Sequence, residues 1–354
     1  MIAKVAILGA GAWGTAVAKV IAEKGVDTTI WGLEPSTCDD INLRRENTRF
    51  LPGVSLPASL KASPDIEKTA EGADYLILAI PSMYLLDTVK KILNVVSIRE
   101  GQTAIAVLAK GFIPAPGGPR LIIETLEDYL PGFYRRSLVY IAGPSHAEEV
   151  ACGKVTGLIA ASESPKNSIR FRHLLKGPRL FVFSSFDVRG VQAAAAAKNV
   201  IAILFGMLEA IKNLDKRGRF GDGSDSLLLA AGLNEIQALG RALGATHPET
   251  FTSISGIGDL DVTCRSQFGR NRRFGLEIIE KKILEPFQNL DDIIGRIGEI
   301  GYLPEGLTAT KYVWELMEKH KLKLPLCAGL HQILNREIQP MDFLESFLSE
   351  LGKQ

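Results

Sequence analysis

Three glycines directly follow the first apolar run of this chain. Residues 5–8 are Val-Ala-Ile-Leu, and Gly9, Gly11 and Gly14 come next at the spacing Gly-x-Gly-x-x-Gly, ahead of a helix-forming stretch at residues 15–24. At this spacing the first glycine permits a tight turn, the second lets backbone approach a pyrophosphate, and the third lets helix and strand pack closely. We therefore expect a strand–turn–helix unit that binds a dinucleotide at the helix N-terminus. A glycine-rich turn without a ligand is the alternative.

The residue after the second expected strand bears on the choice of dinucleotide. Glu34 stands about 20 positions after the glycines, where a carboxylate accepts hydrogen bonds from the ribose and repels a 2′-phosphate. Leu33 beside it adds no positive charge. The sequence therefore favours NAD as the cofactor. NADP stays open, because Arg44, Arg45 or Arg49 could fold back to the same place.

Short apolar runs alternate with helix-forming stretches through the first half of the chain. Such runs, bounded by turn residues, are typical of buried strands. Parallel strands need long crossovers, so the alternation predicts an α/β fold with a Rossmann-type, mainly parallel sheet. The Pro- and Gly-containing stretch at 112–119 is expected to be a loop. The expected strands lie at residues 5–8, 28–31, 75–80, 103–107, 138–142, 156–160 and 180–183.

Strand-like runs end near residue 187, and helical patterns follow. We expect helices at 188–211, 224–244, 272–282 and 305–319. Asp222 or Ser224 is a candidate N-cap for the second of these helices, and Gly244 stands just past its end. The sequence thus predicts two domains. Residues 1–186 would form the dinucleotide-binding domain and residues 187–354 an all-helical substrate-binding and catalytic domain.

Composition limits the kinds of partner. The 354 residues include 41 basic and 40 acidic side chains, a net charge of +1, which argues against nucleic acid or a membrane surface as partner. The four cysteines and five histidines show no metal-ligand spacing, so no metal site is expected. The apolar run at 200–208 is too short to span a bilayer, and the first strand starts at Ile2, leaving no room for a secretory signal. We expect a cytoplasmic protein.

Two lysines stand at positions where chemistry is plausible. Lys110 follows the expected strand at 103–107, and ligands of open α/β sheets bind beyond the carboxyl ends of strands. A solvated surface lysine is the alternative. Lys198, followed by Asn199, lies inside an alanine-rich helix, so it either extends outward to water or faces a functional cleft. In a cleft, desolvation would lower its pKa towards the range useful for proton transfer.

An acidic residue and a basic segment follow two glycine-containing turns. Asp259 comes after Gly-Ile-Gly, and residues 270–273, Arg-Asn-Arg-Arg, come after Gly269 at the start of an expected helix. Arginine binds phosphate through two hydrogen bonds, and a helix start adds further donors. The pattern suits a phosphorylated polyol, with a solvated helix face as the alternative.

Taken together and in this order, these motifs resemble the NAD(P)-dependent glycerol-3-phosphate dehydrogenase family. The resemblance implies interconversion of glycerol 3-phosphate and dihydroxyacetone phosphate, a role in supplying glycerophospholipid synthesis, and a homodimer. Lys198 resembles the family's general base, which takes the proton of the C2 hydroxyl while hydride leaves C2 for the nicotinamide. Further matching segments are 47–53 (Asn-Thr-Arg-Phe-Leu-Pro-Gly), 79–82 (Ala-Ile-Pro-Ser), 143–149 (Gly-Pro-Ser-His-Ala-Glu-Glu), 220–222, 258–264 and 304–306.

The same resemblance implies the residues of the site. Asp259 would orient Lys198 or a substrate hydroxyl, with Thr263 and Asn199 as supporting polar groups. Arg270 and Asn271 are assigned to the phosphate. The expected substrate contacts are Lys110, Gly143, Ser145, Lys198, Asp259, Gly269, Arg270 and Asn271. The expected cofactor contacts are Gly9, Gly11, Ala12, Trp13, Gly14, Glu34, Lys110, Ala147, Arg270, Leu303 and Glu305.

The chain also departs from the family pattern. The loop at 212–219 is longer, Gly223 replaces an asparagine, and Asp225 and Ala231 replace basic residues. Residues 194–197 and Gly269 differ as well. Two other functions stay open. A related two-domain dehydrogenase of another small hydroxylated acid or phosphate is disfavoured by the acidic and basic segments just described, and an inactive NAD-binding redox sensor is disfavoured by the retained lysine.

Overall fold

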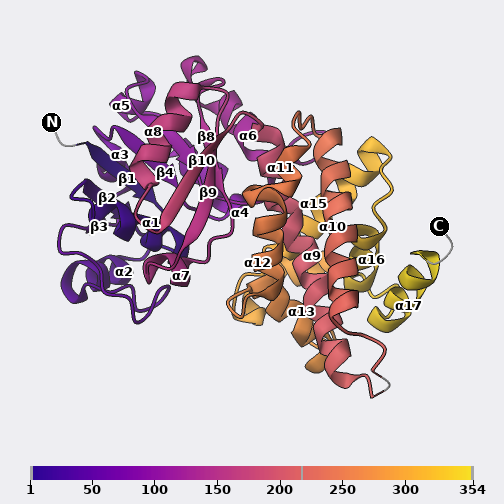
Figure 1. Ribbon diagram of the computed structural model, residues 1–354. Helices are drawn as coiled ribbons and strands as arrows, with labels where there is room; N and C mark the ends of the chain where they lie inside the picture. Colours follow the sequence, from indigo (N-terminus) through magenta and orange to yellow (C-terminus); the bar gives the residue numbers. More distant parts are fainter. Residues whose placement is uncertain (1–2, 217, 352–354) are drawn as a thin grey trace. The chain divides into compact units, whose positions relative to one another are not determined.

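The computed structural model describes residues 3–216 and 218–351, which leaves Ile2 outside the described residues. The chain forms two compact units (Figure 1). The first comprises Met1–Ile113 and Arg120–Gln192, and the second comprises Pro114–Pro119 and Ala193–Gln354.

The first unit is built on an eight-stranded sheet with the order β10-β9-β8-β5-β4-β1-β2-β3. Neighbouring strands are parallel except β8 and β9, which are antiparallel. The expected Rossmann-type, mainly parallel sheet is therefore confirmed. The strands are β1 (Lys4–Leu8), β2 (Asp27–Trp31), β3 (Lys61–Ser63), β4 (Tyr75–Leu78), β5 (Ala104–Val107), β8 (Val139–Ala142), β9 (Thr156–Ala161) and β10 (Leu180–Ser185).

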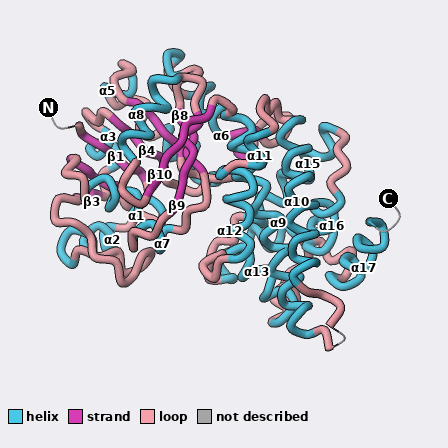
Figure 2. Tube along the Cα trace, in the orientation of Figure 1, coloured by secondary structure: helices cyan, strands magenta, loops and turns pink. Residues whose placement is uncertain are grey.

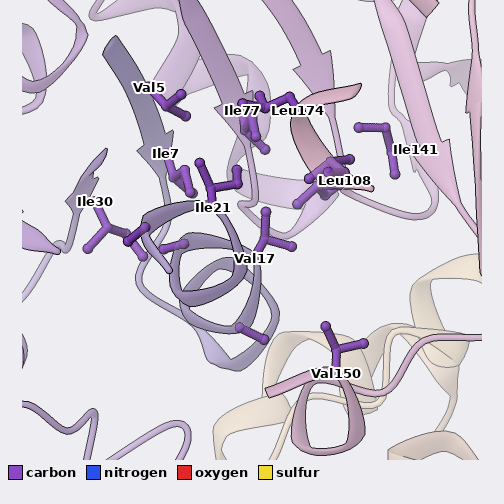
Figure 3. Packing of buried hydrophobic residues seen from close by; sticks show 14 of the residues in the cluster. Val5, Ile7, Val17, Ile21, Ile30, Ile77, Leu108, Ile141, Val150 and Leu174 are labelled. Carbon is purple, nitrogen blue, oxygen red and sulfur yellow. The ribbon is translucent and has the colours of Figure 1, made fainter. Parts of the chain in front are cut away.

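Apolar side chains of helix α1 (Ala12–Ala22) pack against the sheet. Figure 3 shows Val17 and Ile21 of α1 facing the strands that carry Ile7 and Ile77. Burial of each such side chain stabilises the fold by about 1.5–3 kcal/mol. The packing fixes the start of α1 beside the glycine turn.

A lysine ties the end of α1 to the end of another helix. The Nζ of Lys24 donates to the carbonyl oxygens of His173, Leu174 and Lys176, at 2.9, 2.7 and 3.0 Å. His173 and Leu174 lie in the last turn of α8 (Pro165–Leu175) and Lys176 is its C-cap, where a helix leaves carbonyls unpaired. The other helices of this unit are α2 (Pro35–Asp39), η1 (Asp40–Arg44), α3 (Ile66–Ala70), α4 (Ser82–Lys90), α5 (Val96–Arg99), α6 (Ile122–Tyr129), η2 (Gly132–Tyr134), α7 (Ala147–Ala151) and α8 (Pro165–Leu175).

The stretch expected to be a loop contains a strand. β6 (Phe112–Ile113) pairs antiparallel with β7 (Arg120–Leu121), so the expectation of a loop throughout 112–119 is wrong at its first two residues. Residues 112–113 form a strand because they pair with β7, which follows the prolines and glycines of this stretch. The composition of residues 112–119 does not indicate this pairing. The short, half-exposed strand β3 was not expected for the same reason.

The second unit is helical (Figure 2). Its central helix α9 (Val188–Leu214) begins in the first unit and is long and apolar enough to cross a membrane, but its most apolar window is 94% buried inside the protein, as in the core helix of a soluble protein. The further helices are α10 (Asp222–Ala242), α11 (Glu249–Thr252), η3 (Ile254–Gly258), α12 (Asp259–Arg265), α13 (Arg270–Glu280), α14 (Leu290–Gly295), η4 (Ile297–Ile300), α15 (Gly306–His320), α16 (Pro325–Leu334) and α17 (Pro340–Leu351).

Two of these helices begin earlier than expected. Helix α10 begins at Asp222, so its N-cap is Gly221, and the expectation of Asp222 or Ser224 at that position is wrong. The Oγ of Ser224 instead accepts a hydrogen bond from the backbone N–H of Gly221 at 2.9 Å. Helix α13 begins at Arg270 rather than at residue 272, which places Arg270 in its first turn.

Candidate active site

The glycine turn after β1 has the shape that a dinucleotide requires. Gly9 has φ +119°, and a Cβ there would lie 2.5 Å from the carbonyl oxygen of Ala79. A Cβ on Gly14 would lie 2.0 Å from the carbonyl oxygen of Gly9. A Cβ on Gly11, by contrast, would meet no atom within 4 Å. Gly9 and Gly14 thus serve close packing, whereas Gly11 leaves open space at the start of α1.

Several expected site residues follow the carboxyl ends of parallel strands. Strands β8, β5, β4, β1 and β2 are neighbours in this order and parallel, so their carboxyl ends meet at one edge of the sheet. Lys110 follows β5, Gly143 and Ser145 follow β8, and Glu34 follows β2. Strands β2 and β3 lie on one side of β1, and β4, β5 and β8 lie on the other. The strand order therefore reverses between β1 and β4, and sheets of this kind bind ligands at such a switch point.

Local contacts explain the residue types at this edge. Gly143 has φ +147°, and a Cβ there would lie 2.6 Å from the carbonyl oxygen of Gly157. The Oγ of Ser145 donates to the carbonyl oxygen of Gly143 at 3.1 Å. The other expected cofactor contacts of this unit lie at helix starts. Ala12 and Trp13 stand in the first turn of α1, and Ala147 is the first residue of α7.

Lys198 lies on α9 with its amine inside the second unit. Its Nζ is 2.5 Å from Oδ1 of Asp259 and 2.7 Å from Oγ1 of Thr263. The side chains of Lys198 and Asp259 are 6% and 1% exposed, which rules out the outward-facing alternative. Thr263 in turn donates to the backbone oxygen of Asp259 at 2.6 Å. The amine is thus held in place by a carboxylate and a hydroxyl, both from α12.

Two further buried groups lie close to Lys198, Asn199 next to it in the chain and Cys264 on α12. The side-chain nitrogen Nδ2 of Asn199 is buried and has no hydrogen-bond acceptor among the described residues. A buried donor of this kind calls for a partner. Cys264 is buried, and its burial raises the pKa of the thiol, while the positive charge of Lys198 opposes the rise. The thiol of Cys264 is therefore neutral, and Nδ2 of Asn199 is the donor that can still form a hydrogen bond.

The basic segment at the start of α13 divides into two kinds of arginine. The guanidinium of Arg272 makes two hydrogen bonds to the carboxylate of Glu209, and that of Arg273 pairs with Glu277 at 3.0 Å. Arg272 therefore ties α13 to α9, whereas Arg273 pairs within α13. Arg270, exposed in the first helical turn, is the arginine of this segment that has no ion-pair partner among residues 3–216 and 218–351.

The match to known proteins covers both units. Residues 4–168 match the model of the NAD-dependent glycerol-3-phosphate dehydrogenase N-terminus, and residues 187–345 match that of its C-terminus. The chain belongs to the NAD-dependent glycerol-3-phosphate dehydrogenase family. A glycerol-3-phosphate dehydrogenase [NAD(P)+] from Treponema denticola is 54% identical over 98% of each chain, and one from Bacillus velezensis is 34% identical over 94% of this chain and 90% of its own.

Solved structures agree with this family. The crystal structure of glycerol-3-phosphate dehydrogenase from Coxiella burnetii is 30% identical, covers 98% of this chain and 99% of its own, and superposes with a TM-score of 0.83. A ketopantoate reductase from Ralstonia eutropha, 15% identical over 96% of this chain and 99% of its own, reaches a TM-score of 0.55. That lower similarity concerns the fold alone.

The loop that carries Leu303 and Glu305 is fastened at both ends to α13, the helix that begins at Arg270. Oδ1 of Asn271 accepts the N–H of Gly306 at 2.9 Å, which caps α15. The hydroxyl of Tyr302 donates to the buried carboxylate of Glu277. Burial alone would raise the pKa of Glu277, but hydrogen bonds from Tyr302, Lys281 and Arg273 together lower it.

Sequence reasoning assigned no role to Tyr302 or Glu277. It also assigned Asn271 to the phosphate without foreseeing that its oxygen caps a helix. Gly269 packs elsewhere, against the end of α12, since a Cβ there would lie 2.9 Å from the carbonyl oxygen of Thr263. The contacts of Tyr302 with Glu277 and of Asn271 with Gly306 join segments 25 and 35 residues apart in sequence. In the sequence, the match of residues 304–306 to the family pattern was the signal that this loop has a role.

Three departures from the family pattern, the loop at 212–219, Gly223 and Asp225, lie between the end of α9 and the first turn of α10. Residue 217 of this loop lies outside the described residues. Lys212 pairs with Asp225 at 2.7 Å, which joins the end of α9 to the start of α10. Gly223 has open space around its Cβ position. Asp225 thus replaces a basic residue of the family with the partner of a lysine in this chain. Among the described residues, no group of three or more His, Cys, Asp or Glu side chains could hold a metal ion.

Proposed function

We propose that this protein interconverts sn-glycerol 3-phosphate and dihydroxyacetone phosphate with NAD(H) or NADP(H) as hydride carrier. The proposal rests on membership of the family and on one observation, the buried amine of Lys198 between Asp259 and Thr263. A residue so placed can move a proton, since burial, hydrogen bonding and a fixed orientation are what a general acid or base requires.

In this proposal Lys198 accepts the proton of the substrate's C2 hydroxyl during oxidation and donates it during reduction. A nicotinamide bound beside this amine would supply the hydride-transfer chemistry at C2. As the C2 hydroxyl becomes a carbonyl, its proton passes to neutral Lys198; in the reverse direction the ammonium of Lys198 returns it. Asp259 and Thr263 hold Nζ in one orientation, and Nδ2 of Asn199 can donate to a substrate oxygen.

Arg270 is proposed to bind the phosphate. Its exposed guanidinium stands in the first turn of α13, where the helix dipole also favours an anion. Asn271 contributes its amide nitrogen, because its oxygen is engaged with Gly306. Gly269, Lys110, Gly143 and Ser145 are proposed as further substrate contacts on the basis of the family resemblance.

The dinucleotide is proposed to lie on the glycine turn. Gly9, Gly11 and Gly14 would form the turn and the open space for the pyrophosphate, and Glu34 would accept the ribose hydroxyls. Residues 1–186 would thus bind the cofactor and residues 187–354 the substrate. The remaining proposed cofactor contacts are Ala12, Trp13, Lys110, Ala147, Arg270, Leu303 and Glu305.

The test is spectrophotometric reduction of dihydroxyacetone phosphate, run with NADH and with NADPH. We expect turnover with at least one of them, and ketopantoate should not be reduced at a comparable rate. Absence of turnover with both dinucleotides would overturn the proposal in favour of a related dehydrogenase.

The setting of the activity is proposed from the same family resemblance. The product glycerol 3-phosphate would supply glycerophospholipid synthesis in the cytoplasm. A near-zero net charge of +1 favours a small-molecule substrate over nucleic acid or a membrane surface as partner. We further propose a homodimer, which light scattering of the purified protein would detect as twice the 38.4 kDa mass of the chain.

A further inference from the structure

A tight turn at residues 47–51 is fastened directly to the glycine turn. Asn47 is 1% exposed, and its Nδ2 donates to the carbonyl oxygen of Ala10 at 2.9 Å and to Oγ1 of Thr15 at 2.8 Å. Its Oδ1 accepts the N–H of Phe50 at 3.1 Å, which closes the turn. The two hydrogen bonds of Nδ2 are buried and the amide is fully paired, so these contacts hold the turn against the glycine turn.

Arg49 stands at the tip of this turn and reaches the carboxylate expected to bind ribose. Its Nη1 lies 3.0 Å from Oε1 of Glu34, and its guanidinium lies over the ring of Phe50, 4.9 Å from the centroid. The side chains of Arg49 and Glu34 are 59% and 40% exposed. An ion pair this exposed contributes little to stability, so a competing anion can separate it at little cost.

The other two candidate arginines are engaged elsewhere. The guanidinium of Arg44 pairs with Asp40 at 3.4 Å, and that of Arg45 donates to the carbonyl oxygen of Leu60 at 3.1 Å. Leu33, beside Glu34, is 69% exposed and uncharged. Arg49 is thus the cation that meets Glu34 at the end of β2.

We propose that Arg49 determines how well this protein accepts NADP relative to NAD. With NAD, Arg49 keeps Glu34 oriented towards the ribose hydroxyls. With NADP, Arg49 leaves Glu34 and binds the 2′-phosphate, which the carboxylate alone would repel. The pair makes the site tolerant of both dinucleotides. This inference rests on the proposed function, because it assumes that the adenosine ribose lies beside Glu34.

Calorimetric titration with NAD+ and NADP+, which differ in the 2′-phosphate alone, tests the inference without any catalytic turnover. In Arg49→Ala the affinity ratio of NADP+ to NAD+ should fall tenfold or more. In Glu34→Gln the same ratio should rise, since the repulsion is removed. Arg44→Ala is the matched control, an exposed arginine of the same region that pairs with Asp40, and its ratio should equal that of the wild type.

The outcomes separate the inference from the proposed function. A ratio within twofold of the wild type in Arg49→Ala, or an equal fall in Arg44→Ala, would overturn the inference while dinucleotide binding itself stands. Failure of the folded wild-type protein to bind either dinucleotide would overturn the proposed function and the inference with it. An unchanged melting temperature in Arg49→Ala would confirm that a change in ratio reports binding.

Discussion

Lys198 places an ammonium group among the alanines of a buried helix, where an unpaired charge would be strongly destabilising. Asp259 compensates that charge, and Thr263 provides a further hydrogen bond. Pairs of this kind seldom add net stability compared with apolar residues of similar size. Their presence in a core therefore points to a chemical use for the amine.

The first prediction concerns this pair. Asp259→Asn leaves the ammonium without its carboxylate and should lower the free energy of unfolding by about 3–5 kcal/mol. The double variant Lys198→Met with Asp259→Leu removes both charges and should recover most of that loss, yet remain inactive. Urea unfolding followed by circular dichroism measures the first effect. Wild-type stability in Asp259→Asn would show that the pair is not buried as described.

The second prediction separates the glycines of the turn. Gly9→Ala places a Cβ 2.5 Å from the carbonyl oxygen of Ala79 at φ +119°, so it should destabilise the protein by more than about 1 kcal/mol. Gly11→Ala has space for its Cβ and should melt like the wild type, but its affinity for NAD+ should fall about tenfold. Melting curves and calorimetry distinguish the two effects. Equal melting temperatures for both variants would contradict this division of roles.

At the scale of elements, strands that coincide with apolar runs were predictable from sequence, and the short strands without such a run were not. β1, β4 and β5 are continuous apolar runs, and their positions follow from composition to within two residues. β3 and β6 owe their strand conformation to their partners, which no local pattern shows. Site residues that the family motifs carry, such as Lys198, were likewise predictable. The Glu277–Tyr302 contact was not, because its partners are 25 residues apart and in different elements.

The third prediction tests that contact as a support for the loop at 303–305. Tyr302→Phe removes the hydroxyl that donates to Glu277 and keeps the ring under Arg273. We expect a severalfold higher KM for the dinucleotide with kcat changed less than twofold, because the loop is proposed to contact cofactor and not the reacting atoms. Tyr312→Phe on α15 is the matched control and should leave both constants unchanged. A fall in kcat with an unchanged KM would contradict the role.

For the molecule as a whole, stability depends on a carboxyl group far in sequence from the residues it caps. Glu235 on α10 accepts the N–H groups of Leu326 and Cys327 at 2.6 and 3.0 Å, at the start of α16. Burial raises the pKa of Glu235 from 4.5 to about 7, although these hydrogen bonds oppose the rise. The folded protein therefore holds a proton that the unfolded chain releases near pH 4.5.

The fourth prediction gives the sign of the resulting pH dependence. Because the folded pKa is the higher one, the contribution of Glu235 is most favourable below pH 4.5 and declines as pH rises to about 7, by up to about 3 kcal/mol. Glu235→Gln cannot ionise, so its stability relative to the wild type should improve between pH 5 and pH 8. Urea midpoints at the two pH values measure this. A difference that stays constant with pH would refute the assignment.

The central claim, that the amine of Lys198 carries the proton of the reaction, is tested most directly by chemical rescue of Lys198→Ala. We predict that reduction of dihydroxyacetone phosphate falls about 100- to 10,000-fold while the variant still binds NADH, and that added methylamine restores part of the rate by entering the space left beside Asp259 and Thr263. Reduction at the wild-type rate without added amine would contradict the claim.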